Sequence, residues 1–280
     1  MVFITGIQGQ LGYDVAKVLK ERGMEYIAPT LEELDITKNE NVREVLFKYR
    51  PEIVVHCAAY TAVDKSEDEE EVCRKINADG TRYIAECCRE IGAKMVYIST
   101  DYVFPGTGED AYEVDDITGP LGIYGQTKLE GELAVKELLE KYFIIRISWV
   151  FGKNGNNFIK TMLRIGKERE EVSVVSDQIG SPTYTVDLAK LICDMIVTEK
   201  YGVYHATNEG FCSWAELAAE TFKMAGYPTK VNFITTAEYP TRAVRPLNSR
   251  MSKAALDESG FERLPDWKDA VRRYFKEIME

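Results

Sequence analysis

Short apolar runs alternate with longer amphipathic stretches along the first half of the chain. The apolar runs predict strands at 2–5, 25–28, 52–59, 94–100 and 142–148. The stretches between them have helical spacing and predict helices at 10–22, 39–50, 68–92 and from 124 onward. Strands that are apolar almost throughout are typical of a parallel sheet covered on both faces. The alternation therefore predicts an α/β fold with a doubly wound parallel sheet.

The pattern loosens beyond residue 150. Residues 151–180 and 208–280 contain short elements, Pro and Gly breaks and several arginines, whereas 181–207 contain one helical pattern and one strand-like run. We expect 181–207 to return to the sheet. The two flanking stretches are expected to form mainly a small C-terminal lobe over the carboxyl edge of the strands, where open α/β sheets bind ligands.

Composition narrows the class of protein. The chain has 280 residues, of which 45% are hydrophobic and 29% charged, as expected for a soluble globular protein. A net charge of −11 without a basic cluster argues against nucleic acid as a partner. No apolar segment reaches the roughly 20 residues that span a membrane. The first residues form a strand-like run instead of a signal peptide, so we expect a cytoplasmic protein.

Cysteine and histidine usage does not indicate a metal centre. The six cysteines include no C-x-x-C pair, and the only two histidines are His56 and His205, so no zinc spacing exists. We expect reduced thiols and no metal site. Both histidines fall in strand-like runs and are predicted to be core residues, as are Trp214 and Phe222.

A glycine-rich loop follows the first predicted strand. The stretch ITGIQGQLG places Gly6, Gly9 and Gly12 where the chain turns into the first helix. Glycine permits a tight turn and lets backbone N–H groups approach a pyrophosphate, which the helix N-terminus also favours. We therefore predict that residues 1–150, with 181–207, form a Rossmann-like dinucleotide-binding domain, and that 151–180 and 208–280 mainly form the substrate lobe.

The stretch YGQTK places Tyr124 and Lys128 one helical turn apart, on the same helix face. A nearby cation favours ionisation of a phenol, and such a phenol can donate a proton near neutral pH. Alone, this spacing is also common in surface helices. With the glycine spacing, and with Ser99 and Thr100 ending the fourth strand, it resembles the extended branch of the short-chain dehydrogenase/reductase superfamily, which uses a Tyr-x-x-x-Lys motif and an upstream Ser or Thr.

Longer stretches resemble the dTDP-4-dehydrorhamnose reductase family over nearly the whole chain. They are AAYTAVDKSE (58–67), STDYVFPGTG (99–108), YGQTKLEGE (124–132), RISWVFGKNGNNF (146–158) and RPLNSRM (245–251). The resemblance implies an NAD(P)H-dependent oxidoreductase that reduces the C4 ketone of dTDP-4-dehydro-L-rhamnose. This reaction is the last step of dTDP-L-rhamnose biosynthesis and serves polysaccharide synthesis.

The resemblance also implies roles for individual residues. Tyr124 is expected to donate the proton, Lys128 to activate it, and Thr100 to hold the ketone oxygen. Cofactor contacts are expected from the glycine loop, from the ends of the next strands and from the Tyr–Lys pair: Gly6, Gly9, Gln10, Leu11, Gly12, Thr30, Asp35, Ile36, Ala58, Ala59, Tyr60, Thr61, Ser99, Tyr124 and Lys128. Substrate contacts are expected from Thr100, Asp101 and Trp149.

Three charge patterns refine these expectations. Arg242 and Arg245 have guanidinium groups suited to a substrate diphosphate, although ordinary surface arginines are an equal alternative. The acidic run 67–71 is predicted to be a solvated helix start. Glu32, Glu33 and Asp35 follow the second strand, and their negative charge should repel a 2′-phosphate. We therefore expect NADH as the cofactor, with NADPH possible.

Two alternatives remain at this point. A sugar-nucleotide 4,6-dehydratase or 4-epimerase of the same superfamily would share the glycine loop and the Tyr–Lys pair. Dehydratases follow their threonine with Asp-Glu, whereas Thr100 precedes Asp101 and Tyr102, which argues against dehydration. A non-catalytic regulatory subunit, like the β subunit of methionine adenosyltransferase, is the second alternative. The oligomeric state, monomer or homodimer, is left open.

Overall fold

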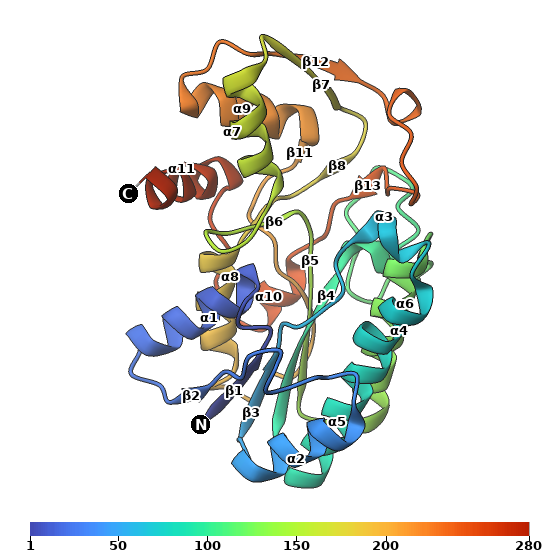
Figure 1. The fold of residues 1–280 in the computed structure, drawn as a ribbon, viewed down its shortest axis with the longest axis vertical. Helices are drawn as coiled ribbons and strands as arrows, with labels where there is room; N and C mark the ends of the chain where they lie inside the picture. The colour runs from blue at the N-terminus through green and yellow to red at the C-terminus, as the bar shows by residue number, and fades with distance from the viewer. Residues whose placement is uncertain (280) are drawn as a thin grey trace.

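The computed structural model describes residues 1–279 and has a parallel sheet at its centre (Figure 1). The strand order is β10-β5-β4-β3-β1-β2, and every neighbouring pair is parallel. The strands are β1 (Val2–Thr5), β2 (Tyr26–Ile27), β3 (Ile53–His56), β4 (Lys94–Thr100), β5 (Tyr142–Ile147) and β10 (Gly202–His205). The predicted α/β fold is confirmed. The strand order reverses between β1 and β3, where ligands of such sheets bind.

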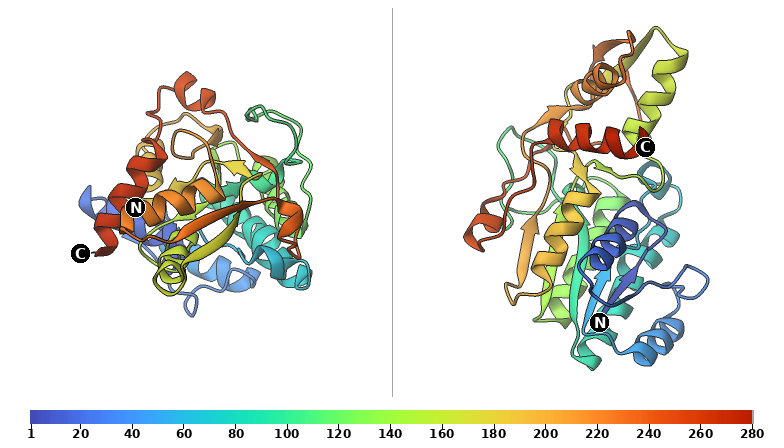
Figure 2. Two further views of the ribbon diagram at one scale, coloured as in Figure 1. Left: turned by 90° about the horizontal axis from the view of Figure 1, so that it is seen from above. Right: turned by 90° about the vertical axis from the view of Figure 1, so that its left-hand side faces the viewer.

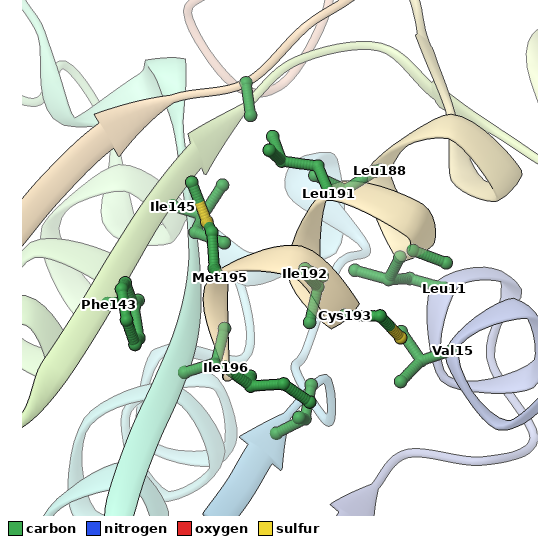
Figure 3. Packing of buried hydrophobic residues seen from close by; sticks show 14 of the residues in the cluster. Leu11, Val15, Phe143, Ile145, Leu188, Leu191, Ile192, Cys193, Met195 and Ile196 are labelled. Carbon is green, nitrogen blue, oxygen red and sulfur yellow. The ribbon is translucent and has the colours of Figure 1, made fainter. Parts of the chain in front are cut away.

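Helices cover both faces of the sheet, as the apolar strands require (Figures 1 and 2). One face carries α1 (Gln10–Glu21), α8 (Thr185–Met195) and α10 (Ala254–Glu258), and the other carries α2 (Asn39–Tyr49), α5 (Gly80–Ile91) and α6 (Ile123–Leu138). Figure 3 shows side chains of α1 and α8 packed against β5, among them Leu11, Val15, Ile145 and Leu188. Each helix buries the apolar stripe that its spacing predicts.

Two predicted elements differ in extent. The strand expected at 52–59 ends at His56, because the chain then passes directly against the glycine loop: a Cβ atom on Gly6 would lie 2.7 Å from the nitrogen of Ala58. The helix expected at 68–92 runs as α4 (Glu70–Arg74), a π-helical turn (Lys75–Asp79) and α5. Single π turns inside helices are frequent at functional sites.

A smaller lobe lies over the carboxyl ends of the strands (Figure 1). It contains α7 (Phe158–Glu168), α9 (Trp214–Ala225), α11 (Trp267–Met279), the parallel pair β7 (Glu171–Val175) and β12 (Lys230–Ile234), and β8 (Ile179–Gly180) between β11 (Cys212–Ser213) and β13 (Asn248–Ser249). Short strands β6 (Val150–Phe151) and β9 (Thr183–Tyr184) pair where the chain leaves the sheet and returns to it.

Part of the last stretch of the chain packs on the sheet instead of in the lobe. Leu256, Phe261 and Leu264 belong to the same buried cluster as α1 and α8. Residues 208–279 therefore divide between both parts of the molecule. Within residues 1–279, no helix is long and apolar enough to cross a membrane.

A buried ion pair fixes α6 against the sheet. The Arg146 guanidinium on β5 donates to both Glu132 carboxylate oxygens on α6, each at 2.8 Å, and the two residues are at most 1% exposed. Arg146 also donates to the carbonyl of Val114 at 3.0 Å, so the pair joins a helix, a strand and a loop. Further hydrogen bonds of this kind are what a buried ion pair needs to offset desolvation.

We predict that Glu132→Gln lowers the free energy of unfolding by about 3–5 kcal/mol, because it leaves the Arg146 guanidinium buried without its counter-charge. Glu137→Gln on the same helix is the control: Glu137 pairs with Arg82 but is 62% exposed, so its loss should change the free energy of unfolding far less. Urea unfolding of both variants measures the difference. Equal effects would contradict a structural role for the buried pair.

Candidate functional site

A cavity of about 780 Å³ lies at the carboxyl ends of the strands, beneath the lobe. Its walls come from the turns after β1, β2 and β3, from the end of β4, from the start of α6, from Trp149 after β5 and from Trp214 of the lobe. The volume is within the range of cofactor and small-molecule sites. The cavity is at the sheet edge that the sequence predicts.

The glycine loop forms one end of the cavity. Gly6 has φ +73°, and a Cβ atom on Gly12 would collide with the Gly6 carbonyl oxygen, so both positions require glycine. Gly9 precedes α1, whose open N-terminus faces the cavity. The Gln10 side chain reaches the lobe instead, where its oxygen accepts from the Gly152 nitrogen at 2.9 Å. The loop thus presents backbone donors to the cavity and also holds the lobe.

The turns after β2 and β3 line the same end of the cavity. Thr30, Asp35, Ile36, Ala58, Ala59 and Thr61 are all lining residues. Tyr60 is not a lining residue: its phenol donates to Glu69 at 2.6 Å, and its nitrogen donates to Asn77. Of the predicted residues in these two turns, Tyr60 alone is turned away from the cavity.

Asp35 is less negative toward the cavity than the sequence suggests. Its carboxylate accepts from the Thr37 hydroxyl at 2.7 Å and pairs with Lys38 at 3.0 Å. The Thr37 hydroxyl, with the Lys38 ammonium, lowers the Asp35 pKa. Glu33 accepts from the nitrogen of Thr30 at 2.8 Å. The carboxylate of Asp35 is therefore ionised and partly neutralised.

Thr100, Tyr124 and Lys128 line the same cavity. Thr100 ends β4, and Tyr124 and Lys128 lie one turn apart at the start of α6, all three lining the cavity. The α6 N-terminus is fixed by Glu67, whose carboxylate accepts from the nitrogen of Ile123 at 2.9 Å. The ring of Tyr102 contacts that of Tyr124 edge-on at 5.4 Å between centroids. Structure thus brings together the trio that the motifs predict.

Burial, more than the neighbouring cation, controls the charges of this trio. It raises the Tyr124 pKa above its usual range, although the Thr100 hydroxyl opposes the rise. It lowers the Lys128 pKa to about 7, against the attraction of Glu132. The Lys128 ammonium lies 4.2 Å from the centroid of the Tyr97 ring. Desolvation therefore outweighs any effect of Lys128 on the Tyr124 pKa and keeps the phenol neutral. A neutral phenol remains suited to proton donation.

Two tryptophans form a stacked wall on the lobe side. Trp149 has φ +50°, a strained conformation for a residue other than glycine, and stacks on Trp214 at 3.9 Å and 18°. Gly180 accommodates this pair, since a Cβ there would lie 3.0 Å from Trp149. Trp214, at the start of α9, packs against two buried clusters as a core residue would, but it is only partly buried because it also lines the cavity. Phe222 is buried as predicted.

Arg242 and Arg245 are not among the residues that line the cavity. Arg242 pairs with Asp68 at 2.6 Å, and Arg245 pairs with Asp64 at 2.5 Å and donates to the Tyr102 phenol at 3.2 Å. These contacts join the lobe to α3 (Val63–Ser66) and the residues after it.

The acidic run 67–71 is correspondingly not just a solvated helix start. Glu67 accepts from the α6 N-terminus, Asp68 pairs with Arg242, and Glu69 accepts from Tyr60. Sequence periodicity misses these roles because each partner is distant along the chain.

Asp101 and Ser249 form a buried polar contact beside Thr100. The Ser249 hydroxyl donates to one Asp101 carboxylate oxygen at 2.5 Å, and the Thr100 hydroxyl donates to the other at 2.9 Å. Burial raises the Asp101 pKa to about 6, although both hydroxyls lower it. Ser249 is not among the site residues that the sequence predicts. The stretch RPLNSRM, which contains it, was the signal that could have identified it. Ser99 lines the cavity, and its buried hydroxyl has no partner among residues 1–279.

His56 and His205 are core residues, as predicted. Both are at most 1% exposed, and burial lowers the pKa of each to about 3. His56 shares a hydrogen bond with the Thr5 hydroxyl at 2.7 Å. In the part of the chain that the structure describes, no group of three or more His, Cys, Asp or Glu side chains is placed to hold a metal ion.

Comparison with known proteins agrees with this geometry. The family model of the RmlD substrate binding domain matches residues 1–280. The chain is 42% identical to the spore coat polysaccharide biosynthesis protein SpsK of Bacillus subtilis, covering 99% of the chain and 97% of SpsK. It is 40% identical to the dTDP-4-dehydrorhamnose reductase of Aggregatibacter actinomycetemcomitans, covering 97% of both. A crystal structure of dTDP-4-dehydrorhamnose reductase from Bacillus anthracis, in complex with NADP, matches with a TM-score of 0.96, 46% identity and coverage of 99% and 98%.

We predict that Lys128→Met stabilises the fold most strongly at low pH. The folded pKa of about 7 lies below the ordinary value of 10.5, so the unfolded chain binds more protons between these values and wild-type stability rises with pH across that window. The variant should therefore gain about 3–5 kcal/mol below about pH 7, and the gain should shrink toward alkaline pH. Urea unfolding across pH measures it. The exposed Lys223→Met is the control, and a pH-independent difference for Lys128→Met would refute the buried-charge account.

Proposed function

The chain belongs to the dTDP-4-dehydrorhamnose reductase family, and from this we propose that it reduces the C4 ketone of dTDP-4-dehydro-L-rhamnose to dTDP-L-rhamnose with NAD(P)H, the last step of dTDP-rhamnose biosynthesis. The observation that carries the proposal is the meeting of Thr100, Tyr124 and Lys128 in one cavity that ends at the glycine loop. A dinucleotide at the loop and a ketone at the trio would occupy adjoining parts of that cavity.

The residues present fit a nicotinamide dinucleotide. Gly6, Gly9 and Gly12 leave room for backbone donors to approach a pyrophosphate, and the α1 N-terminus adds its positive end. Gln10 and Leu11 belong to the same turn. Thr30, Asp35 and Ile36 would border the adenosine, and Ala58, Ala59 and Thr61 would pass beneath the cofactor. The unpartnered Ser99 hydroxyl and Lys128 would contact its nicotinamide half.

The trio supplies the electrostatics of ketone reduction. Bound nicotinamide supplies the hydride. Thr100 and Tyr124 would donate hydrogen bonds to the ketone oxygen and stabilise the negative charge that develops there. Tyr124, neutral because it is buried, would then give its proton to that oxygen. Lys128, held over the Tyr97 ring, would favour this transfer by stabilising the phenolate that remains.

The substrate would contact Thr100, Asp101 and Trp149, with Trp214 supporting Trp149 from behind. A role for Arg242 and Arg245 on the diphosphate requires that each exchange a carboxylate partner, Asp68 or Asp64, for phosphate oxygens. Arg242 is 63% exposed at its side chain, so such an exchange is sterically open to it.

We predict that Tyr124→Phe lowers kcat by about 10²–10⁴-fold while the cofactor still binds, because the ring remains and the proton is lost. The assay follows the loss of reduced-nicotinamide absorbance with dTDP-4-dehydro-L-rhamnose. Tyr142→Phe is the control, because Tyr142 begins β5 at the end of the strand away from the cavity. A folded wild type that binds NADH but turns over no ketone would refute the proposed substrate and favour an epimerase or a regulatory subunit.

We predict that NADH gives a higher kcat/KM than NADPH, because Glu32 and Glu33 place negative charge beside the adenosine end. The related B. anthracis enzyme holds NADP, so the preference is expected to be modest. Removing both charges with Glu32→Gln and Glu33→Gln should raise the NADPH/NADH ratio of kcat/KM about threefold or more. Glu40→Gln, on α2, is the control, and an unchanged ratio in the double variant would contradict the electrostatic explanation.

A further inference from the structure

A buried hydrogen-bond chain runs from β13 of the lobe to Thr100. The Ser249 hydroxyl donates to Oδ2 of Asp101, and the Thr100 hydroxyl donates to Oδ1. The three residues are 2%, 3% and 4% exposed. Thr100 and Asp101 line the cavity but expose little of their surface, so each depends mainly on these protein partners.

This chain of hydrogen bonds conflicts with the proposed role of Thr100 as a donor to the ketone oxygen. A threonine hydroxyl has one proton and two acceptor positions. The Thr100 proton points to Asp101, and the Thr100 oxygen accepts from the nitrogen of Tyr102 at 3.3 Å. A hydrogen bond to a ketone oxygen needs that same proton, because a ketone only accepts. Turning the hydroxyl would remove one of the donors that stabilise the buried Asp101 carboxylate, which is costly.

We propose that Asp101 takes up a proton from solvent when the ketone substrate binds. The new carboxyl O–H donates to the Thr100 oxygen, so the Thr100 proton is free to donate to the ketone, while Ser249 continues to donate to the other carboxyl oxygen. Atoms balance, since one proton enters from solvent and one returns when the ligand leaves. Asp101 and Ser249 are then positioning residues that act through Thr100. This inference rests on the proposed function.

The surroundings of Asp101 favour the neutral acid. Tyr124 faces it from α6 and Tyr102 from its own turn, and neither phenol carries a positive charge. The nearby arginine, Arg245, is committed to Asp64 and to the Tyr102 phenol. Burial already raises the Asp101 pKa to about 6 while two hydroxyls donate to it. Losing the Thr100 donor to a ketone raises that pKa further.

Calorimetry tests the proton directly. Enzyme loaded with oxidised cofactor, which cannot turn over, is titrated with dTDP-4-dehydro-L-rhamnose at about pH 8 in two buffers of different ionisation enthalpy. We expect uptake of about one proton per ketone bound by wild type. Asp101→Asn should remove that uptake, because a carboxamide can donate to Thr100 through Nδ2 without gaining a proton. dTDP, which has no ketone, is the control ligand.

Kinetics provide an independent readout. Wild-type kcat/KM should contain a limb that falls with rising pH from near 6, because the required form of Asp101 is neutral. Asp101→Asn should lack this limb and lose less activity than Asp101→Leu, which offers no donor. Ser249→Ala removes a donor that stabilises the Asp101 carboxylate and so raises the Asp101 pKa. In this variant the fall of kcat/KM with pH should therefore begin at a higher pH.

The outcomes separate the two proposals. Equal proton uptake by wild type and Asp101→Asn, or an unchanged limb in both Asp101→Asn and Ser249→Ala, would overturn the inference while leaving the reductase reaction intact. Absence of ketone binding and turnover in folded, cofactor-binding wild type would instead overturn the proposed function.

Discussion

The site depends on how α6 is held against the sheet. Tyr124, Lys128 and Glu132 follow one another at successive turns of this helix, and Glu132 is bound through both oxygens to the buried Arg146 of β5. The Glu67 carboxylate fixes the other end of the same helix face. Because α6 is anchored at its N-terminus and again at Glu132, the phenol and the ammonium between these points have little freedom to move away from Thr100 at the end of β4. A shift of a fraction of an ångström in such groups is enough to impair catalysis.

The same burial that orders the site makes it electrostatically costly. A lysine with its pKa near 7, a carboxyl with its pKa near 6 and a neutral phenol line one cavity as largely buried groups. Burial displaces the pKa of each group toward its neutral form, as is common where proton transfer occurs. Stability is thereby given up locally, and the apolar packing on both faces of the sheet offsets it.

The lobe is tied to the sheet by charge as well as by chain connection. Asp64 and Asp68 receive Arg245 and Arg242 from the lobe, and Ser249 of β13 reaches Asp101 at the end of β4. Gln10 in the glycine loop accepts from the lobe nitrogen of Gly152. Ion pairs and hydrogen bonds therefore join the lobe to the sheet on both sides of the cavity. These contacts position the residues that face the substrate as well as those that face the cofactor.

Local sequence determined the strand–helix alternation, the glycine loop, the shared face of Tyr124 and Lys128, and the buried state of both histidines, because these follow from periodicity and backbone geometry within a few residues. Tertiary structure alone decided that Trp214 lines the cavity, that Tyr60 faces away, that two arginines meet carboxylates, and that burial raises the Tyr124 pKa. Ser249 and Asp101 are 148 residues apart, and no local pattern encodes that contact. Desolvation and long-range pairing are set by what the fold places around a side chain, which spacing along the chain does not specify.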